Sequence, residues 1–172
     1  MSPSMIRRLP RLAWFMLFLA PASAVAQQRP LEFHLTFAKS VSAQPFTGRV
    51  YVMLFKQEAK ELRSGPNWLR PDPFFARDVK DWKPGQTIIL GGDALAYPVA
   101  MAKVPKAAYS IQAVMDFDPG ALSFSTAEGN GHSQTVRREL DGATSGPVIL
   151  QIDQVYKAKP FKETERVKLV DI

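Results

Sequence analysis

Short runs of alternating apolar and polar residues constrain the fold of this chain more than any other feature. In Leu31–Phe37 every second residue is apolar, which is typical of a strand with one buried face. Similar strand-like runs recur, and Gly- and Pro-rich turns separate them. They lie at 48–55, 87–90, 108–115, 133–140 and 148–156. With no sustained helical pattern and no βαβ alternation, the sequence predicts an all-β fold, an antiparallel immunoglobulin-like β-sandwich.

The first 26 residues have the three parts of a secretory signal. Basic residues at Arg7, Arg8 and Arg11 precede the apolar run Leu12–Leu19, and small residues end at Ala26. The apolar run is shorter than the roughly 20 residues that a spanning helix needs. We therefore expect cleavage after Ala26 and a periplasmic or secreted bacterial protein, with no membrane segment left after cleavage. The predicted organisation is a signal peptide at 1–26, a β-sandwich at 27–156 and an edge strand or linker tail at 157–172.

Charge and cysteine content exclude several function classes. The formal charge of +6 falls to +3 once the three arginines of the signal are removed, and the remaining basic residues are mixed with acidic ones. Such a surface is not the basic stripe of a nucleic-acid-binding protein, so we expect no nucleic-acid partner. The chain has no cysteine, which excludes disulfides, thiolate catalysis and cysteine-based metal sites.

The segment Arg63–Gly85 combines two tryptophans, two phenylalanines and four prolines with alternating charges. Its proline content predicts one long Pro/aromatic loop rather than a central strand. Two interpretations of the aromatic residues stay open: a stacking platform for a ligand, or a lid that buries the rings over one end of the sandwich. Under the platform interpretation the binding residues are Trp68, Phe74, Phe75, Trp82 and Arg77.

Catalytic and metal-binding patterns are weak in this sequence. No G-x-S-x-G pentapeptide exists, and the two histidines, His34 and His132, are predicted to lie on a sheet face and in a turn. Asp116 and Asp118 resemble the start of a calcium loop, but Gly120 falls one residue early, so Asx-type turns that close a strand are favoured. We predict no catalytic residues, no metal ligands and no cofactor.

Several ordered motifs between Gly48 and Leu169 resemble the N-terminal region of a group of secreted bacterial proteins assigned as esterases. The motifs are GPNW at 65–68, PFFARDV at 73–79, WKPG at 82–85, YSIQAVMDF at 109–117 and PFKETERVKL at 160–169. In that group a β-sandwich precedes an α/β-hydrolase domain related to enterochelin esterases. The present sequence ends at Ile172, about where that hydrolase domain would begin, and matches none of its catalytic residues.

Two functions from different classes follow from these features. The first is an exported, non-catalytic binding or accessory module whose partner is a hydrolase domain or a cell-envelope component. The second is a truncated or split secreted esterase whose catalytic domain is absent from this chain. We favour the first, because a sequence without a nucleophile, base or metal site does not support a reaction. Translation of the DNA downstream of Ile172 would distinguish them, since an esterase requires a nucleophile elbow there.

Overall fold

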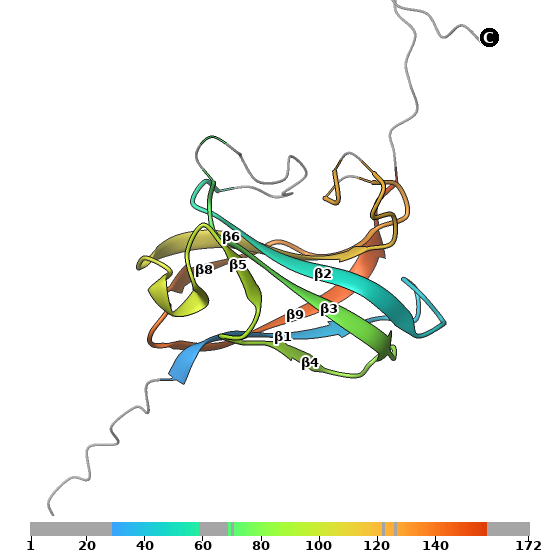
Figure 1. Cartoon of the computed structure of the whole chain (residues 1–172), viewed down its shortest axis with the longest axis horizontal. Coiled ribbons are helices and arrows are strands. Elements are labelled where there is room, and N and C mark those ends of the chain that lie inside the picture. Colours follow the sequence, from blue (N-terminus) through green and yellow to red (C-terminus); the bar gives the residue numbers. More distant parts are fainter. Residues whose placement is uncertain (1–28, 59–68, 70, 122, 126, 158–172) are drawn as a thin grey trace, which may run out of the picture.

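The computed structural model describes residues 29–58, 69, 71–121, 123–125 and 127–157. The predicted signal peptide, Trp68 and almost all of the predicted tail lie outside these residues. The described chain is all-β, with nine strands, one short 3-10 helix and no α-helix (Figure 1). The elements are β1 Arg29–Phe37, β2 Phe46–Phe55, β3 Phe74–Trp82, β4 Ile88–Leu90, β5 Leu95–Tyr97, η1 Met101–Lys103, β6 Ala107–Asp116, β7 Gly131–Ser133, β8 Val136–Leu140 and β9 Ser145–Val155.

The strands form one curled, mixed sheet with the order β4-β1-β9-β7-β6-β2-β3-β5, and β8 pairs with β6 beside β7. The short strand β7 links the two halves of the sheet, because it pairs with β6 on one side and β9 on the other. Figure 1 shows β2 and β3 crossing in front of β9, with β1 and β4 below them. The curl therefore brings the two halves face to face.

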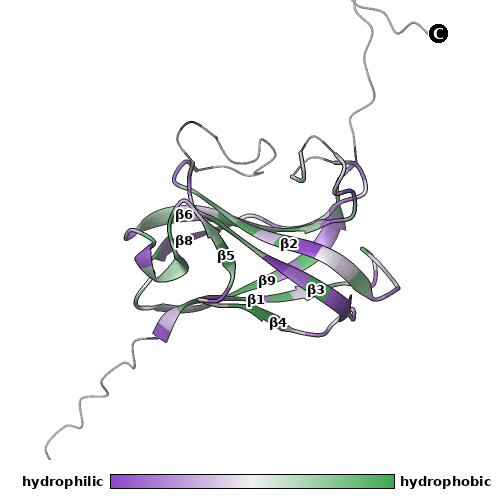
Figure 2. Ribbon diagram, in the orientation of Figure 1, coloured by the Kyte–Doolittle hydropathy of each residue, from purple (hydrophilic) through white to green (hydrophobic). Residues whose placement is uncertain are grey.

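A single large apolar core fills the space between these halves. Alternate residues of β1 and β2 point into it, as their period-two patterns predict. Phe33 of β1 stacks on Phe75 of β3 with ring centroids 5.8 Å apart, which joins the two halves directly. Figure 2 shows hydrophobic colouring along β4, alternating colouring along β1, and hydrophilic colouring on much of β3.

A second, smaller apolar cluster lies on the opposite face of β2 and β6. Met53 and Val114 are fully buried there, although they point away from the main core. Partly buried aromatic side chains pack around them: Tyr51, Phe55, Phe74 and Phe124. Phe124 belongs to the segment between β6 and β7, so this connection covers part of the outer face of the sheet.

The predicted strands at 31–37, 48–55, 87–90, 108–115 and 148–156 are confirmed by β1, β2, β4, β6 and β9. The predicted strand at 133–140 is divided into β7 and β8. The prediction of a wholly antiparallel sheet is wrong, because β1 and β9 run parallel. Parallel neighbours need a long connection, and here it consists of every strand between the first and the last. A search for βαβ units cannot detect such a pair.

The prediction of one long loop over Arg63–Gly85 is also wrong, because residues 74–82 form β3. The prolines that suggested a loop lie outside this strand, at Pro66, Pro71, Pro73 and Pro84. No proline interrupts the ladder that β3 forms with β2. A register shift near the end of β3, with Asp81 at φ +51°, turns Trp82 into the core.

Replacement of Trp82 by alanine should lower the free energy of unfolding by about 3–5 kcal/mol. The Trp82 ring is 2% exposed and packs edge-on against Phe37 with centroids 4.7 Å apart. Its Nε1–H donates to the Gln86 carbonyl at 2.8 Å. A urea denaturation midpoint measures the loss.

Lys80→Ala is the matched control, because Lys80 is an exposed residue of the same strand. The control should change the free energy of unfolding by less than about 0.5 kcal/mol. Equal midpoints for the Trp82 variant and the wild type would contradict the packing of this ring in the core.

Candidate functional site

The structure separates the residues predicted to bind a ligand. Phe75 and Trp82 are 0% and 2% exposed and belong to the main core, so their rings are not available at the surface. Phe74 lies on the outer face, in the second apolar cluster. Arg77 forms an ion pair with Asp93 in the turn between β4 and β5. Trp68 lies outside the described residues. Strand alternation puts Phe74 and Phe75 on opposite faces of the sheet, and the register shift turns Trp82 to the core face, so the predicted platform is divided.

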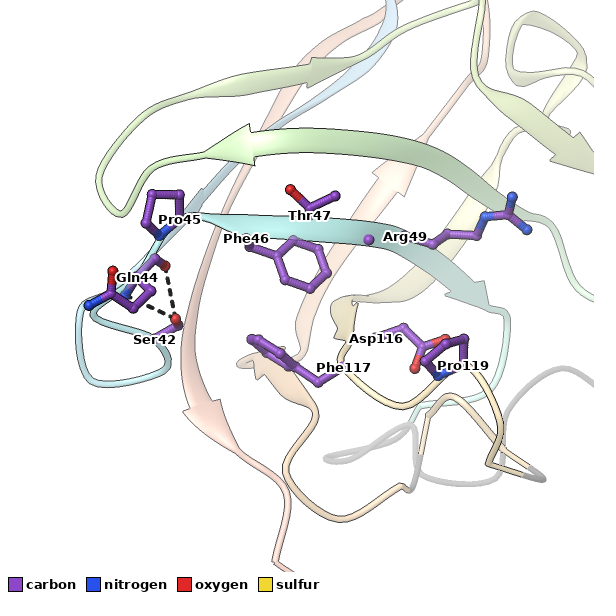
Figure 3. Close-up of a pocket in the computed structure, with 10 residues that line it drawn as sticks. Ser42, Gln44, Pro45, Phe46, Thr47, Arg49, Asp116, Phe117 and Pro119 are labelled. Atoms are coloured by element: carbon purple, nitrogen blue, oxygen red, sulfur yellow. Dashed lines mark hydrogen bonds between the residues drawn. The ribbon is translucent and has the colours of Figure 1, made fainter.

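A groove that the sequence did not indicate runs along the outer side of β2. Two overlapping cavities of about 380 and 470 Å³ form it, and they share Thr47, Gly48, Arg49, Asp116 and Pro119. The walls come from the start of β2, the end of β6 and the residues that follow β6 (Figure 3). Both volumes fall within the range of about 300–1,000 Å³ that is typical of small-molecule sites.

Three charged side chains form a row across the groove. Arg49 of β2 is the register partner of Asp78 on β3 and of Asp116 on β6. Residues in register on adjacent strands project from the same face of a sheet. The sheet itself therefore places Arg49 between two acidic residues, and its guanidinium turns toward Asp78.

Arg49 and Asp78 form a two-pronged ion pair. Arg49 Nε donates to Asp78 Oδ1 at 2.7 Å, and Nη2 donates to Oδ2 at 2.9 Å. This hydrogen bonding holds the pKa of Asp78 below its usual value and is the largest cause that raises the pKa of Arg49. Both side chains are largely exposed, so the pair adds little to stability and mainly fixes the guanidinium plane.

Asp116 is the buried carboxylate of the row, with 6% of the residue exposed. Its Oδ1 accepts hydrogen bonds from the Asp118 backbone N–H and from Asn130 Nδ2, both at 3.2 Å. Asp118 Oδ1 in turn accepts from the Gly120 N–H at 3.2 Å. The predicted Asx-type turns are thus confirmed. Among the described residues no group of three or more histidines and acids is placed to hold a metal ion.

Asn130 holds the segment between β6 and β7 against the sheet. Asn130 is only 1% exposed, and its Oδ1 accepts a hydrogen bond from the Phe117 N–H at 2.7 Å. Its Nδ2 donates to the Phe124 carbonyl at 2.7 Å as well as to Asp116. One buried amide therefore fixes the loop wall of the groove in place.

Aromatic rings flank the charged row on both sides along β2. Phe117, which is 40% exposed, meets Phe46 edge-on with centroids 4.8 Å apart. Figure 3 shows the two rings next to each other. Toward the second cavity, Tyr51 stacks on Phe124 at 3.9 Å. Burial, followed by the charge of Asp116, raises the pKa of the Tyr51 phenol, while Arg49 opposes the shift. The phenol therefore stays protonated at neutral pH.

Among the described residues, neither histidine is hydrogen-bonded to a serine hydroxyl. His34 lies on β1, as predicted, and its Nε2 is 2.8 Å from Glu32 Oε1. His132 lies in β7 rather than in a turn, with Nδ1 3.3 Å from Gln112 Nε2. The neighbouring Ser133 Oγ donates to the Gln134 carbonyl at 2.8 Å and accepts from the Ala113 N–H at 3.0 Å. The Ser133 hydroxyl therefore has a structural role.

Comparison with known proteins gives no relatives for this chain. No protein-family model, no curated protein and no solved structure matches it. The resemblance to the N-terminal regions of secreted esterases therefore stays a prediction. Among the described residues, no helix has the length and apolar character needed to cross a membrane.

Replacement of Asn130 by alanine should lower the free energy of unfolding by about 1–3 kcal/mol. The change removes a buried hydrogen-bond partner of three groups, which are the Phe117 N–H, the Phe124 carbonyl and the Asp116 carboxylate. Urea denaturation measures this loss. Gln134→Ala is the control, because Gln134 is an exposed residue directly after β7. A variant as stable as the wild type would show that Asn130 does not hold this loop.

Replacement of Asp78 by asparagine should produce a small, pH-dependent loss of stability. Because the folded-state pKa of Asp78 is lowered, its ion pair contributes above the unfolded-state value of about 3.9 and is lost as the pH falls through the folded value. The difference between wild type and variant should thus be constant from pH 7 to pH 5 and decrease below about pH 4. Urea midpoints measured across this pH range test the predicted pH dependence. Lys80→Ala is the control, because it removes no acidic group. A difference that grows toward low pH would contradict the ion pair.

Proposed function

We propose that this chain is an exported, non-catalytic binding module and that the groove along β2 is its ligand-binding surface. The observation that carries this proposal is the preorganisation of the groove. The sheet register aligns Asp78, Arg49 and Asp116, the ion pair fixes the guanidinium, and Asn130 holds the opposite wall. Polar groups held in this way bind a ligand without a large cost of ordering side chains.

The fold that we propose for the module is an immunoglobulin-like β-sandwich. Support comes from the main core, which draws its residues from both halves of the curled sheet. Facing sheets that bury alternate residues in a common core are the defining feature of a sandwich. The short strand β7 would then be the link between its two sheets.

Export of the module is proposed from the signal-like sequence of the first 26 residues, with a periplasmic or secreted location as the consequence. The resemblance to esterase N-terminal regions supports an accessory role beside a hydrolase domain or at a cell-envelope component. Mass spectrometry of the protein recovered from the periplasm of an expressing bacterium would test this, with a mature product that begins at Gln27 as the expected result.

The purified mature protein should show no esterase activity. The Ser133 hydroxyl is hydrogen-bonded to backbone partners. In the part of the chain that the structure describes, neither histidine is hydrogen-bonded to a serine hydroxyl, so neither is placed to act as a general base for one. Hydrolysis of short-chain aryl esters should equal the buffer rate. Any turnover should persist unchanged in a variant that carries both His34→Ala and His132→Ala, which would identify it as contamination. Turnover that either change abolishes would contradict the proposal and favour an esterase.

A further inference from the structure

We infer that the groove binds a neutral, polyhydroxylated ring, the chemical class of a pyranose sugar, through the Asp78–Arg49–Asp116 row and the exposed ring of Phe117. This inference rests on the proposed function, because it names the ligand class of the same groove. Charge, hydrogen-bonding capacity and apolar surface in the groove each support it.

The charge pattern favours a neutral ligand over an ionic one. Arg49 lies between two carboxylates in register, and one of them already pairs with it through two hydrogen bonds. An anionic ligand that approaches Arg49 meets Asp78 and Asp116, while a cationic ligand that approaches Asp116 meets Arg49. Like charges brought together in one groove repel each other, and the guanidinium cannot be deprotonated to relieve this repulsion.

The hydrogen-bonding groups of the row suit hydroxyls. A guanidinium has five N–H donors and no acceptor, and the Asp78 pair uses only two of them. Carboxylates only accept. A hydroxyl both donates and accepts, so adjacent hydroxyls of one ring can bond to Arg49 and to a carboxylate at the same time. An apolar ligand would instead desolvate this row without replacing its hydrogen bonds.

The apolar part of the groove suits the C–H face of a sugar ring. Phe117 keeps 40% of its surface exposed, while its edge-on contact with buried Phe46 fixes the ring. The face of an aromatic ring carries negative charge and attracts weakly positive C–H groups. Phe117, Arg49 and Asp116 line the same cavity, so a ring can meet all three at once (Figure 3). Asp78 lines the second cavity, which overlaps the first at Arg49 and Asp116.

Isothermal titration of the mature protein, combined with backbone amide NMR, tests this inference with a defined panel. The neutral probes are cellohexaose, xylohexaose, maltohexaose and chitohexaose. The charged probes are an oligogalacturonate, a chitosan oligomer and a lysine-rich peptide. We expect at least one neutral probe to bind and to shift the amides of Arg49, Asp116 and Phe117. Its Kd should hold nearly constant between 50 and 500 mM NaCl, since screening acts on charged pairs.

Two variants should weaken binding without unfolding the protein. Phe117→Ala should raise the Kd of the neutral probe about three- to tenfold through loss of ring contact. Arg49→Ala should raise it about tenfold or more through loss of charged donors. Arg138→Ala, an exposed arginine on β8 whose strand does not line either cavity, is the matched control and should leave the Kd unchanged. Urea midpoints confirm that each variant is folded.

Two results would overturn the inference in different ways. Binding in the groove of a charged probe alone, with a strongly salt-dependent Kd, would reject a neutral ligand and leave the binding module standing. Binding of no probe, or neutral-sugar binding that neither Phe117→Ala nor Arg49→Ala weakens, would reject the groove as the site and with it the proposed function.

Discussion

The parallel pairing of β1 with β9 is the contact on which the rest of this structure depends. It joins the first and last described strands in register from Glu32–Pro147 to Phe37–Ile152. One half of the curled sheet is built around this pair, and the other half around β2 and β6. Because the core lies between the halves, neither half could bury its apolar face without the other. The two halves of the sheet therefore stabilise each other.

Alternate residues of β2 have different roles: one set packs in the main core, and the other set lines the proposed binding groove. Val50, Val52 and Leu54 point into the main core, whereas Arg49 and Tyr51 project to the groove side. The core residues fix the position of the strand, and the pairing of β2 with β3 and β6 then fixes which charged groups meet on the other face. The rigidity of the proposed site is a consequence of core packing.

A chain of aromatic contacts connects the core to the groove. Trp82 packs against Phe37 and, at 6.4 Å, against Phe46, which in turn meets Phe117 at the surface. The register shift that turns Trp82 inward therefore also supports the ring that borders the groove. A surface side chain that packs against buried rings in this way has few conformations to lose on binding, so its contact with a ligand costs little entropy.

Local sequence determined the strands whose patterns were complete within a few residues. Leu31–Phe37 alternates without interruption, whereas Gly48–Phe55 and Ala108–Met115 are strands with apolar residues on both faces. The Asx turns after β6 follow from side chains that bond to backbone groups two residues away. Tertiary structure decided the rest. The prolines around β3 made its sequence resemble a loop, although the strand itself contains no proline. The parallel β1–β9 pair depends on residues from opposite ends of the domain. The groove could not be predicted because Arg49, Asp78 and Asp116 lie far apart in the sequence. Only the register of three paired strands brings these charges together, and a local pattern holds no information about that register.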